Sequence, residues 1–166
     1  FRGWCTVLVA LTLFTSLGSY RLFFSKGSGV YAGAETFTDI SYATKSNKQK
    51  LDLYLPERNG TPVPLIINVH GGGFGYFGGS KDDETYNVEQ LNAAGFAVAS
   101  VEYRVYQDAL FPAGVQDVKA AVRWLRANAS TYGIDPNKFG ATGRSAGGYM
   151  VAALAVTGDQ STTFDD

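Results

Sequence analysis

The pattern of apolar and polar positions divides the chain from residue 37 onward into strand-like and helix-like stretches. Apolar and polar side chains alternate over residues 37–42 and again over residues 51–55, which predicts strands with one solvated face. Ser46, Asn47 and Lys48 favour a turn between them, so we expect an antiparallel hairpin. Residues 65–69, 96–101 and 139–142 are nearly all apolar, which is typical of strands covered on both faces.

Helical patterns separate these apolar runs. We expect one helix to begin at the acidic residues 82–84 and end at Gly95, and another to run from Pro112 to Gly133. The latter carries one apolar stripe, formed by Val115, Val118, Val122 and Leu125, with Lys119, Arg123 and Arg126 expected on other faces. A further helix is predicted from Ser145 to about Val156.

A hairpin followed by alternating strands and helices predicts an α/β fold with a mostly parallel sheet. Ligands and chemistry in such sheets lie at the carboxyl ends of the strands. Two glycine-rich segments fall at those ends, at residues 70–73 and 143–148. The candidate site is therefore expected where these segments meet.

The N-terminal residues predict a targeting segment rather than part of the domain. Residues 4–17 carry no charge, and Arg2 precedes them, which is typical of a secretory signal. A membrane anchor through residues 4–24 is one alternative, and a buried element of the domain is another. We interpret residues 1–34 as signal or anchor plus a small-residue linker, and residues 35–166 as part of one folded domain. The protein is accordingly expected to be secreted or membrane-anchored.

Composition excludes several classes of function. The chain has 166 residues, a net charge of −1 and no basic block, so nothing indicates nucleic-acid binding. A single cysteine rules out an internal disulfide framework. The sequence has no metal-ligand cluster and no dinucleotide loop, so we expect no metal and no cofactor. The oligomeric state does not follow from the sequence.

The segment from Gly143 to Gly147 fits the pattern Gly-x-Ser-x-Gly around Ser145. In this pattern the serine occupies a strained strand-to-helix turn that exposes its hydroxyl, and small flanking residues are required. The predicted strand before it and the predicted helix after it are the context that the pattern demands. A glycine-rich turn of a nucleotide-binding fold is the alternative, but its glycine spacing differs and it lacks the serine.

His70-Gly71-Gly72-Gly73 forms the second motif. Consecutive glycines let backbone N–H groups turn toward a substrate and bind the oxyanion of a tetrahedral intermediate. The alternative is a flexible surface loop, which Gly75, Gly78 and Gly79 would also suit.

Together these motifs resemble bacterial carboxylesterases of the α/β-hydrolase superfamily, close to the hormone-sensitive-lipase-like and feruloyl-esterase-like groups. The resemblance runs from about Lys50 to Ala155. It rests on Leu51-Asp52-Leu53-Tyr54-Leu55-Pro56, His70-Gly71-Gly72-Gly73-Phe74, Ser100-Val101-Glu102-Tyr103-Arg104, Phe111-Pro112-Ala113 with Asp117, Tyr132-Gly133-Ile134-Asp135-Pro136 and Gly143-Arg144-Ser145-Ala146-Gly147-Gly148. The implied fold is the α/β-hydrolase fold, and the implied substrate is a small-molecule or polysaccharide-linked ester.

The resemblance also implies a role for each site residue. Ser145 is expected to be the nucleophile, and Ala146 is expected to give one oxyanion-binding N–H. The other N–H groups would come from Gly71 and Gly72, with Gly73 as an alternative. His70 is expected to support the oxyanion loop rather than act as the base, because the superfamily orders its triad Ser, then acid, then His.

The superfamily places its acid and its histidine after later strands. We therefore expect the chain to be the N-terminal part of a longer domain, with the C-terminal strands missing, and to be inactive by itself.

Two segments depart from the lipase-like pattern. Val105-Tyr106-Gln107 replaces a segment that contributes to the substrate pocket, and Arg144 stands where an acid or small residue is common. Arg144 is expected either to favour acidic substrates or, as we prefer, to face outward.

Two other functions compete with esterase. One is a non-catalytic binding module on a hydrolase scaffold, which would not need both motifs. The other is a prolyl-oligopeptidase-like serine peptidase, which shares Gly-x-Ser-x-Gly-Gly-Tyr. The His-Gly-Gly-Gly loop favours the esterase.

Overall fold

A computed structural model describes residues 35–57 and 60–158 of the protein. The predicted targeting segment and linker in residues 1–34 lie outside this part of the chain. Among the described residues, no helix is both long and apolar enough to cross a membrane.

A five-stranded mixed sheet forms the centre of the molecule, with strand order β1-β2-β4-β3-β5. The strands are β1 (Glu35–Ser41), β2 (Lys50–Leu55), β3 (Val63–Val69), β4 (Ala97–Val101) and β5 (Ile134–Gly143). The antiparallel β1–β2 hairpin and the parallel β4–β3–β5 core are both as predicted. β5 begins earlier than the predicted residue 139, and its first part pairs with β3 through a register shift between Val63 and Leu65.

The helices are η1 (Lys81–Glu84), α1 (Val88–Ala93), α2 (Ala113–Ala127), α3 (Ala129–Tyr132) and α4 (Ala146–Thr157). The single helix predicted over residues 82–95 is wrong, because the segment forms η1, which a capping box of Ser80 with Asp83 begins and which ends at Glu84, and then α1 as a separate helix. The side-chain amide of Asn68 on β3 also donates to the side-chain oxygen of Asn87 at 2.7 Å, and this bond holds Asn87 outside a continuous helix.

The predicted helix over residues 112–133 is likewise interrupted. The side chain of Asn128 donates to the Trp124 carbonyl oxygen at 2.8 Å, and this local bond competes with continued helix. The α4 prediction is confirmed, with Ser145 at the N-cap position.

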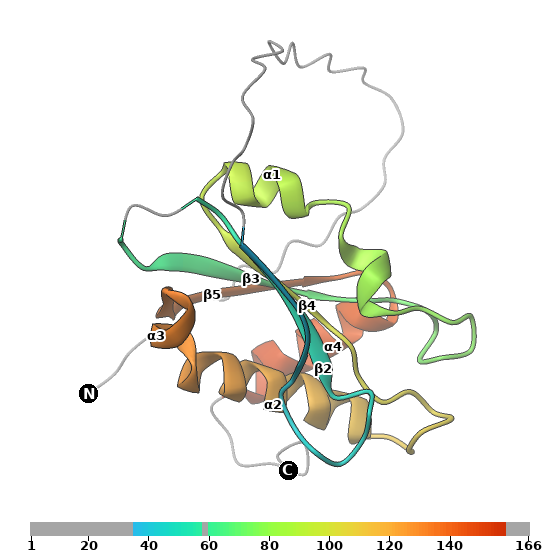
Figure 1. Ribbon diagram of the computed structural model, residues 1–166. Coiled ribbons are helices and arrows are strands. Elements are labelled where there is room, and N and C mark those ends of the chain that lie inside the picture. The colour runs from blue at the N-terminus through green and yellow to red at the C-terminus, as the bar shows by residue number, and fades with distance from the viewer. Residues whose placement is uncertain (1–34, 58–59, 159–166) are drawn as a thin grey trace, which may run out of the picture.

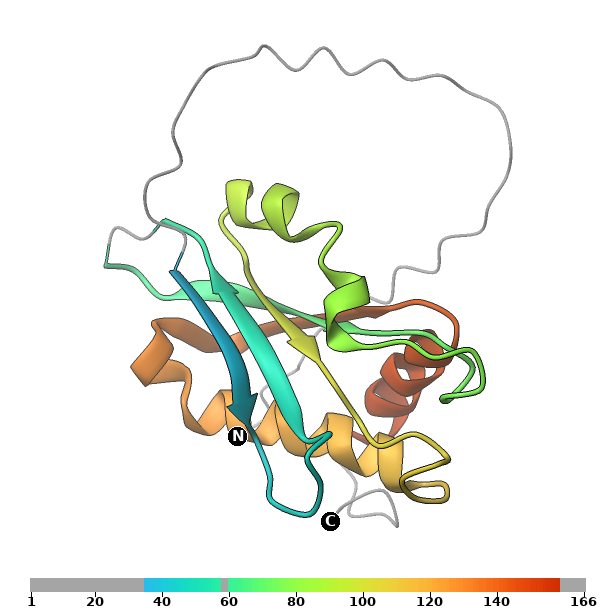
Figure 2. The same cartoon turned by 45° about the vertical axis from the view of Figure 1, so that its right-hand side comes forward.

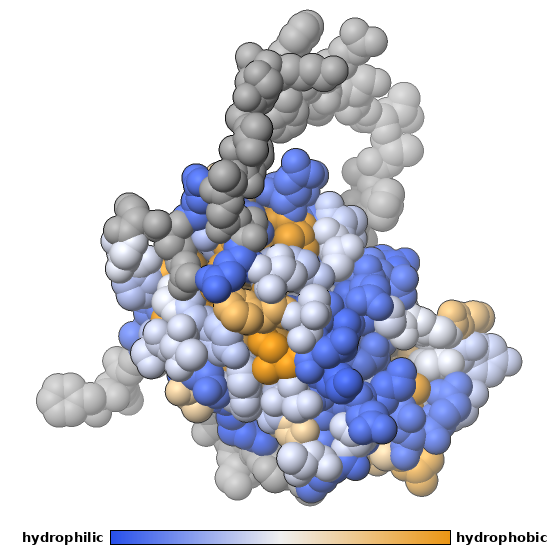
Figure 3. Space-filling view, viewed as in Figure 1, coloured by the Kyte–Doolittle hydropathy of each residue, from blue (hydrophilic) through white to orange (hydrophobic). Residues whose placement is uncertain are grey.

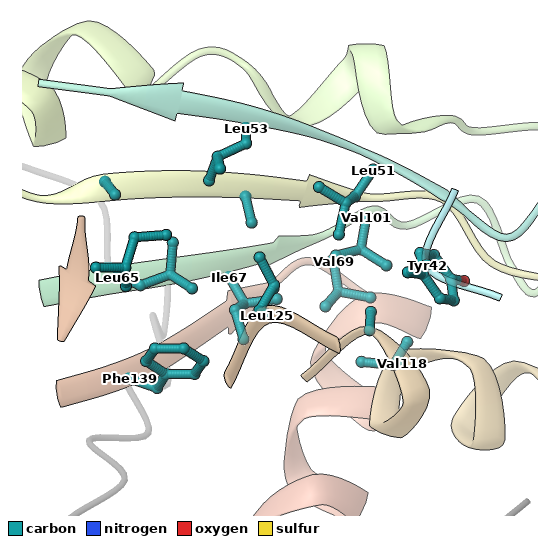
Figure 4. Packing of buried hydrophobic residues seen from close by; sticks show 14 of the residues in the cluster. Tyr42, Leu51, Leu53, Leu65, Ile67, Val69, Val101, Val118, Leu125 and Phe139 are labelled. Atoms are coloured by element: carbon teal, nitrogen blue, oxygen red, sulfur yellow. The ribbon is translucent and has the colours of Figure 1, made fainter. Parts of the chain in front are cut away.

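Helices cover both faces of the sheet (Figures 1 and 2). α2 and α4 lie together below it, and α1 with η1 lies above it. Figure 4 shows side chains of the sheet, among them Leu51, Ile67 and Val69, packing onto Val118 and Leu125 of α2. Burial of each large aliphatic side chain contributes roughly 1.5–3 kcal/mol, so this layer holds α2 and the strand ends in place.

Lys119 of α2 was expected on a different face from the apolar stripe, and its burial was not predicted. It is buried, and its ammonium donates to the Thr157 carbonyl oxygen at 3.0 Å. A cation there satisfies a carbonyl at the C-terminal end of α4, where the helix dipole favours positive charge.

Candidate active site

Ser145 lies on a tight turn between β5 and α4. Its backbone has φ 53° and ψ −116°, a left-handed conformation that is strained for a residue with a side chain. The residue is exposed, and its side chain makes no capping hydrogen bond to α4. The turn therefore presents a free hydroxyl at the N-terminus of a 12-residue helix.

Close backbone approach explains the glycine at position 147. A Cβ there would lie 2.0 Å from the carbonyl oxygen of Val69 and 2.6 Å from that of His70. Only glycine lets the start of α4 pack against the end of β3. This contact brings the serine turn and the loop after β3 together at one edge of the sheet.

The loop after β3 lies directly against the serine turn. A Cβ on Gly71 would be 3.6 Å from the Cβ of Ser145 and 2.9 Å from the Arg144 carbonyl oxygen. Turns order the loop: the Gly72 carbonyl oxygen accepts from the N–H groups of Gly75 and Phe77, each at 3.0 Å. The loop is thus folded back on itself.

Four backbone donors around the serine turn are free of protein partners. Within residues 35–57 and 60–158, no acceptor is hydrogen-bonded to the N–H of Gly71, Gly72, Gly73 or Ala146. All four belong to the loop of residues 70–73 after β3, called the glycine loop below, or to the first turn of α4. An anion bound beside Ser145 would therefore find donors from both segments.

His70 lies beneath the glycine loop and is fully buried. Its Nδ1 is 2.7 Å from the Gly71 carbonyl oxygen, and its Nε2 is 3.1 Å from a Glu102 carboxylate oxygen. The imidazole stacks on the Tyr103 ring at 4.2 Å, and the Tyr103 hydroxyl donates to the His70 carbonyl oxygen at 2.8 Å. Both ring nitrogens therefore face oxygen atoms inside the protein.

The surroundings of Glu102 lower the pKa of its carboxyl group. Burial by itself raises the pKa of Glu102, but hydrogen bonding and charge from His70, the charge of Lys48 and the Lys81 N–H outweigh it and hold that pKa below its usual value. The acid and the imidazole therefore form one buried support for the glycine loop.

A second buried acid, Asp117 of α2, holds the segment after β4. Its carboxylate accepts from the Arg104 N–H at 2.8 Å, from the Arg104 guanidinium at 2.7–3.1 Å and from the Gln49 amide at 2.7 Å. These hydrogen bonds hold Arg104 in place immediately before the 105–107 segment. Gln107 then donates to the Gly75 carbonyl oxygen at 2.9 Å, so the segment that departs from the lipase-like pattern packs against the glycine loop.

Sequence reasoning missed a third buried acid, Glu84 at the end of η1. Its Oε1 lies 3.5 Å from the Nε of Arg144, the residue that precedes Ser145. Arg144 does face outward, as preferred above, with its side chain 70% exposed. No local pattern marks this pair, because the two residues come from elements far apart in the sequence.

Exposed aromatic side chains border the candidate site. Phe74 and Tyr149 meet edge to face with ring centroids 5.6 Å apart, and Tyr76 and Phe77 continue the exposed surface. Figure 3 shows hydrophobic atoms at the right-hand end of the molecule, over the loops that follow β3 and β4. Among the described residues, no group of His, Cys, Asp and Glu side chains is arranged to hold a metal ion.

A strained serine turn at the carboxyl end of parallel strands, with a glycine loop beside it, defines the α/β-hydrolase class. The chain belongs to the BD-FAE family, whose model matches residues 51–166.

Several proteins similar to this chain carry names of esterases. The chain is 36% identical over 93 residues to carboxylesterase NlhH of Mycobacterium tuberculosis, covering 56% of this chain and 29% of that protein. It is 30% identical over 156 residues to isoprenylcysteine alpha-carbonyl methylesterase of Arabidopsis thaliana, covering 90% and 34%. A solved truncated form of a carbohydrate esterase from gut microbiota is 37% identical with a TM-score of 0.70, covering 80% and 47%. The chain thus spans about a third of the length of these two curated relatives, at 29% and 34%.

Proposed function

We propose that the full-length protein hydrolyses carboxylic esters by acyl transfer to Ser145. The observation that carries this proposal is the strained, exposed Ser145 turn facing a glycine loop with free N–H donors. The family membership and the esterase relatives support the same reaction.

In the proposed mechanism, Oγ of Ser145 attacks the ester carbonyl carbon and its proton passes to a base. The negative oxygen of the tetrahedral intermediate binds the N–H groups of Ala146, Gly71 and Gly72, with Gly73 as the alternative donor. Collapse breaks the bond to the alcohol, which leaves with a proton, and water then hydrolyses the acyl-serine. One oxyanion donor of this kind is typically worth about 10²–10³ in turnover.

His70 supports the glycine loop in this proposal and does not act as the base. It is the only histidine in the 166 residues, and both of its ring nitrogens are occupied within the protein. We therefore propose that the triad acid and histidine come from a part of the full-length protein outside residues 1–166, so that these residues alone hydrolyse esters at a very low rate.

The substrate we propose is a small-molecule ester or an ester carried on a polysaccharide. The similarity to a carbohydrate esterase from gut microbiota supports the second kind, and the exposed aromatic surface beside Ser145 offers apolar contact area for either.

The test is a substrate panel on full-length protein. We expect turnover of 4-nitrophenyl acetate and butyrate, labelling of Ser145 by a fluorophosphonate probe, and loss of both in Ser145→Ala. Ser130→Ala is the matched control, since Ser130 is an exposed serine on α3. Acetylated xylan and methyl ferulate then separate polysaccharide from small-molecule esters.

Two outcomes would contradict the proposal. Faster cleavage of peptide amides than of esters would favour the prolyl-oligopeptidase-like alternative. Equal, low turnover by wild type and Ser145→Ala, without labelling, would favour a non-catalytic binding module.

We further propose that residues 4–24 direct export or anchor the protein in a membrane. The uncharged run after Arg2 supports this proposal. Cell fractionation of full-length protein with and without residues 1–34 tests it, and identical distribution of the two would contradict it.

A further inference from the structure

Glu84 is a buried acid that contacts Arg144, the residue directly before the proposed nucleophile, and the proposed reaction does not use it. Only 2% of its side chain is exposed, and its Oε1 accepts no hydrogen bond among the described residues. A buried ionised carboxylate without full hydrogen bonding is costly, and such groups in native structures call for an explanation.

Two further interactions connect Glu84 with segments that lead into the glycine loop. Asn68, near the end of β3, donates from its side chain to the Glu84 carbonyl oxygen at 2.7 Å. Burial raises the pKa of Tyr103, and the charges of Glu102 and Glu84 raise it further. The Tyr103 hydroxyl in turn donates to the carbonyl oxygen of His70, directly before the glycine loop.

Arg144 is the cation that contacts the Glu84 carboxylate. Its Nε lies 3.5 Å from Oε1 of Glu84, too far for a strong hydrogen bond, so the contact is mainly Coulombic. Its main chain belongs to the serine turn, because its carbonyl oxygen accepts from the Gly147 N–H at 2.9 Å. The Arg144 side chain therefore extends from the serine turn to the buried Glu84 carboxylate.

Negative charge behind Ser145 would oppose the reaction. The transition state places new negative charge on the substrate oxygen, and a like charge in a partly buried site raises its energy. A guanidinium beside that acid cancels the repulsion.

We propose that Arg144 is a positioning residue that acts through Glu84, offsetting the buried carboxylate so that the oxyanion can form beside Ser145. The inference rests on the proposed esterase function and adds a residue to it. Arg144 contacts neither the substrate nor the reacting atoms in this role.

The experiment measures kcat and KM of full-length protein on neutral 4-nitrophenyl esters. We expect Arg144→Gln to lower kcat about tenfold with KM within about twofold, the size of one like charge felt at an effective dielectric near 20. Arg144→Lys should keep most of kcat. Glu84→Gln should leave kcat unchanged or higher, and the double variant Glu84→Gln/Arg144→Gln should recover most of the loss.

Lys138→Gln is the matched control, because Lys138 is an exposed cation on β5 that pairs with Asp135 away from the serine turn. It should match wild type. Thermal unfolding of every variant separates a change in kcat from loss of the folded protein.

Distinct results would overturn the proposal. An unchanged kcat in Arg144→Gln, or a loss that persists in the double variant, would exclude action through Glu84. A rise in KM confined to carboxylate-bearing esters would make Arg144 a substrate-binding residue instead. Wild type that does not exceed Ser145→Ala would overturn the esterase proposal itself, and this inference with it.

Discussion

Two buried acids on opposite sides of the candidate site differ in how completely their carboxylates are hydrogen-bonded. Asp117, 1% exposed, accepts hydrogen bonds from the Arg104 main chain and guanidinium and from Gln49. Within the described part of the chain, Glu84, 2% exposed, has one carboxylate oxygen without a hydrogen bond, 3.5 Å from the Nε of Arg144. The difference teaches that burial alone does not reveal what an acid does: Asp117 holds the segment after β4, whereas Glu84 contacts the arginine that precedes the proposed nucleophile.

The largest expected effect is at the fully bonded acid. Asp117→Ala removes the carboxylate to which Arg104 and Gln49 donate, and breaking a buried ion pair in this way costs about 3–5 kcal/mol of unfolding free energy. Urea denaturation of full-length protein measures it. Asp108→Ala, at an exposed acid in the following loop, should cost much less. Equal losses of unfolding free energy would mean that the hydrogen bonds of Asp117 stabilise the protein no more than an exposed acid does.

An intermediate effect, dependent on pH, is expected at Glu102. Its pKa is lowered in the folded protein, so its contribution to stability is present above the unfolded pKa near 4.5 and is lost as pH falls through the lower folded value. Glu102→Gln should therefore reduce the melting temperature at pH 7 and flatten its decline in acid. Thermal unfolding from pH 7 to pH 3 measures this, and parallel curves for both proteins would contradict it.

The smallest expected effect on stability is at Glu84. Glu84→Gln removes an incompletely bonded buried charge, so the unfolding free energy should change by less than about 1 kcal/mol or rise. The same urea titration measures it. A loss as large as that of Asp117→Ala would show that the two acids are structurally equivalent and would remove the contrast.

Much of the fold followed from periodicity in the sequence. Alternation predicted the β1–β2 hairpin, and continuous apolar runs predicted the strands β3, β4 and β5. Helix boundaries were less predictable around residues 85–87 and at Asn128, where side-chain hydrogen bonds to other elements or to the local backbone decide the break.

The candidate site divides in a similar way. Its two glycine-rich segments could be predicted from the sequence, because close approach of backbone requires glycine at fixed positions of each motif. Gly71 and Gly147 are two such positions. The buried position of Lys119 and the pairing of Glu84 with Arg144 were not visible, since both depend on which surfaces meet. The roles proposed for Ser145 and its neighbours await the experiments above.

The sequence by itself determined the α/β class, the hairpin, and a serine turn and a glycine loop at strand ends, because local periodicity and glycine spacing are written along the chain. Only the tertiary structure decided that β4 lies between β2 and β3, that His70 is enclosed by Glu102 and Tyr103, and that Arg144 reaches Glu84. These features depend on contacts between segments distant in the chain, where packing and desolvation rather than local preference select the partner.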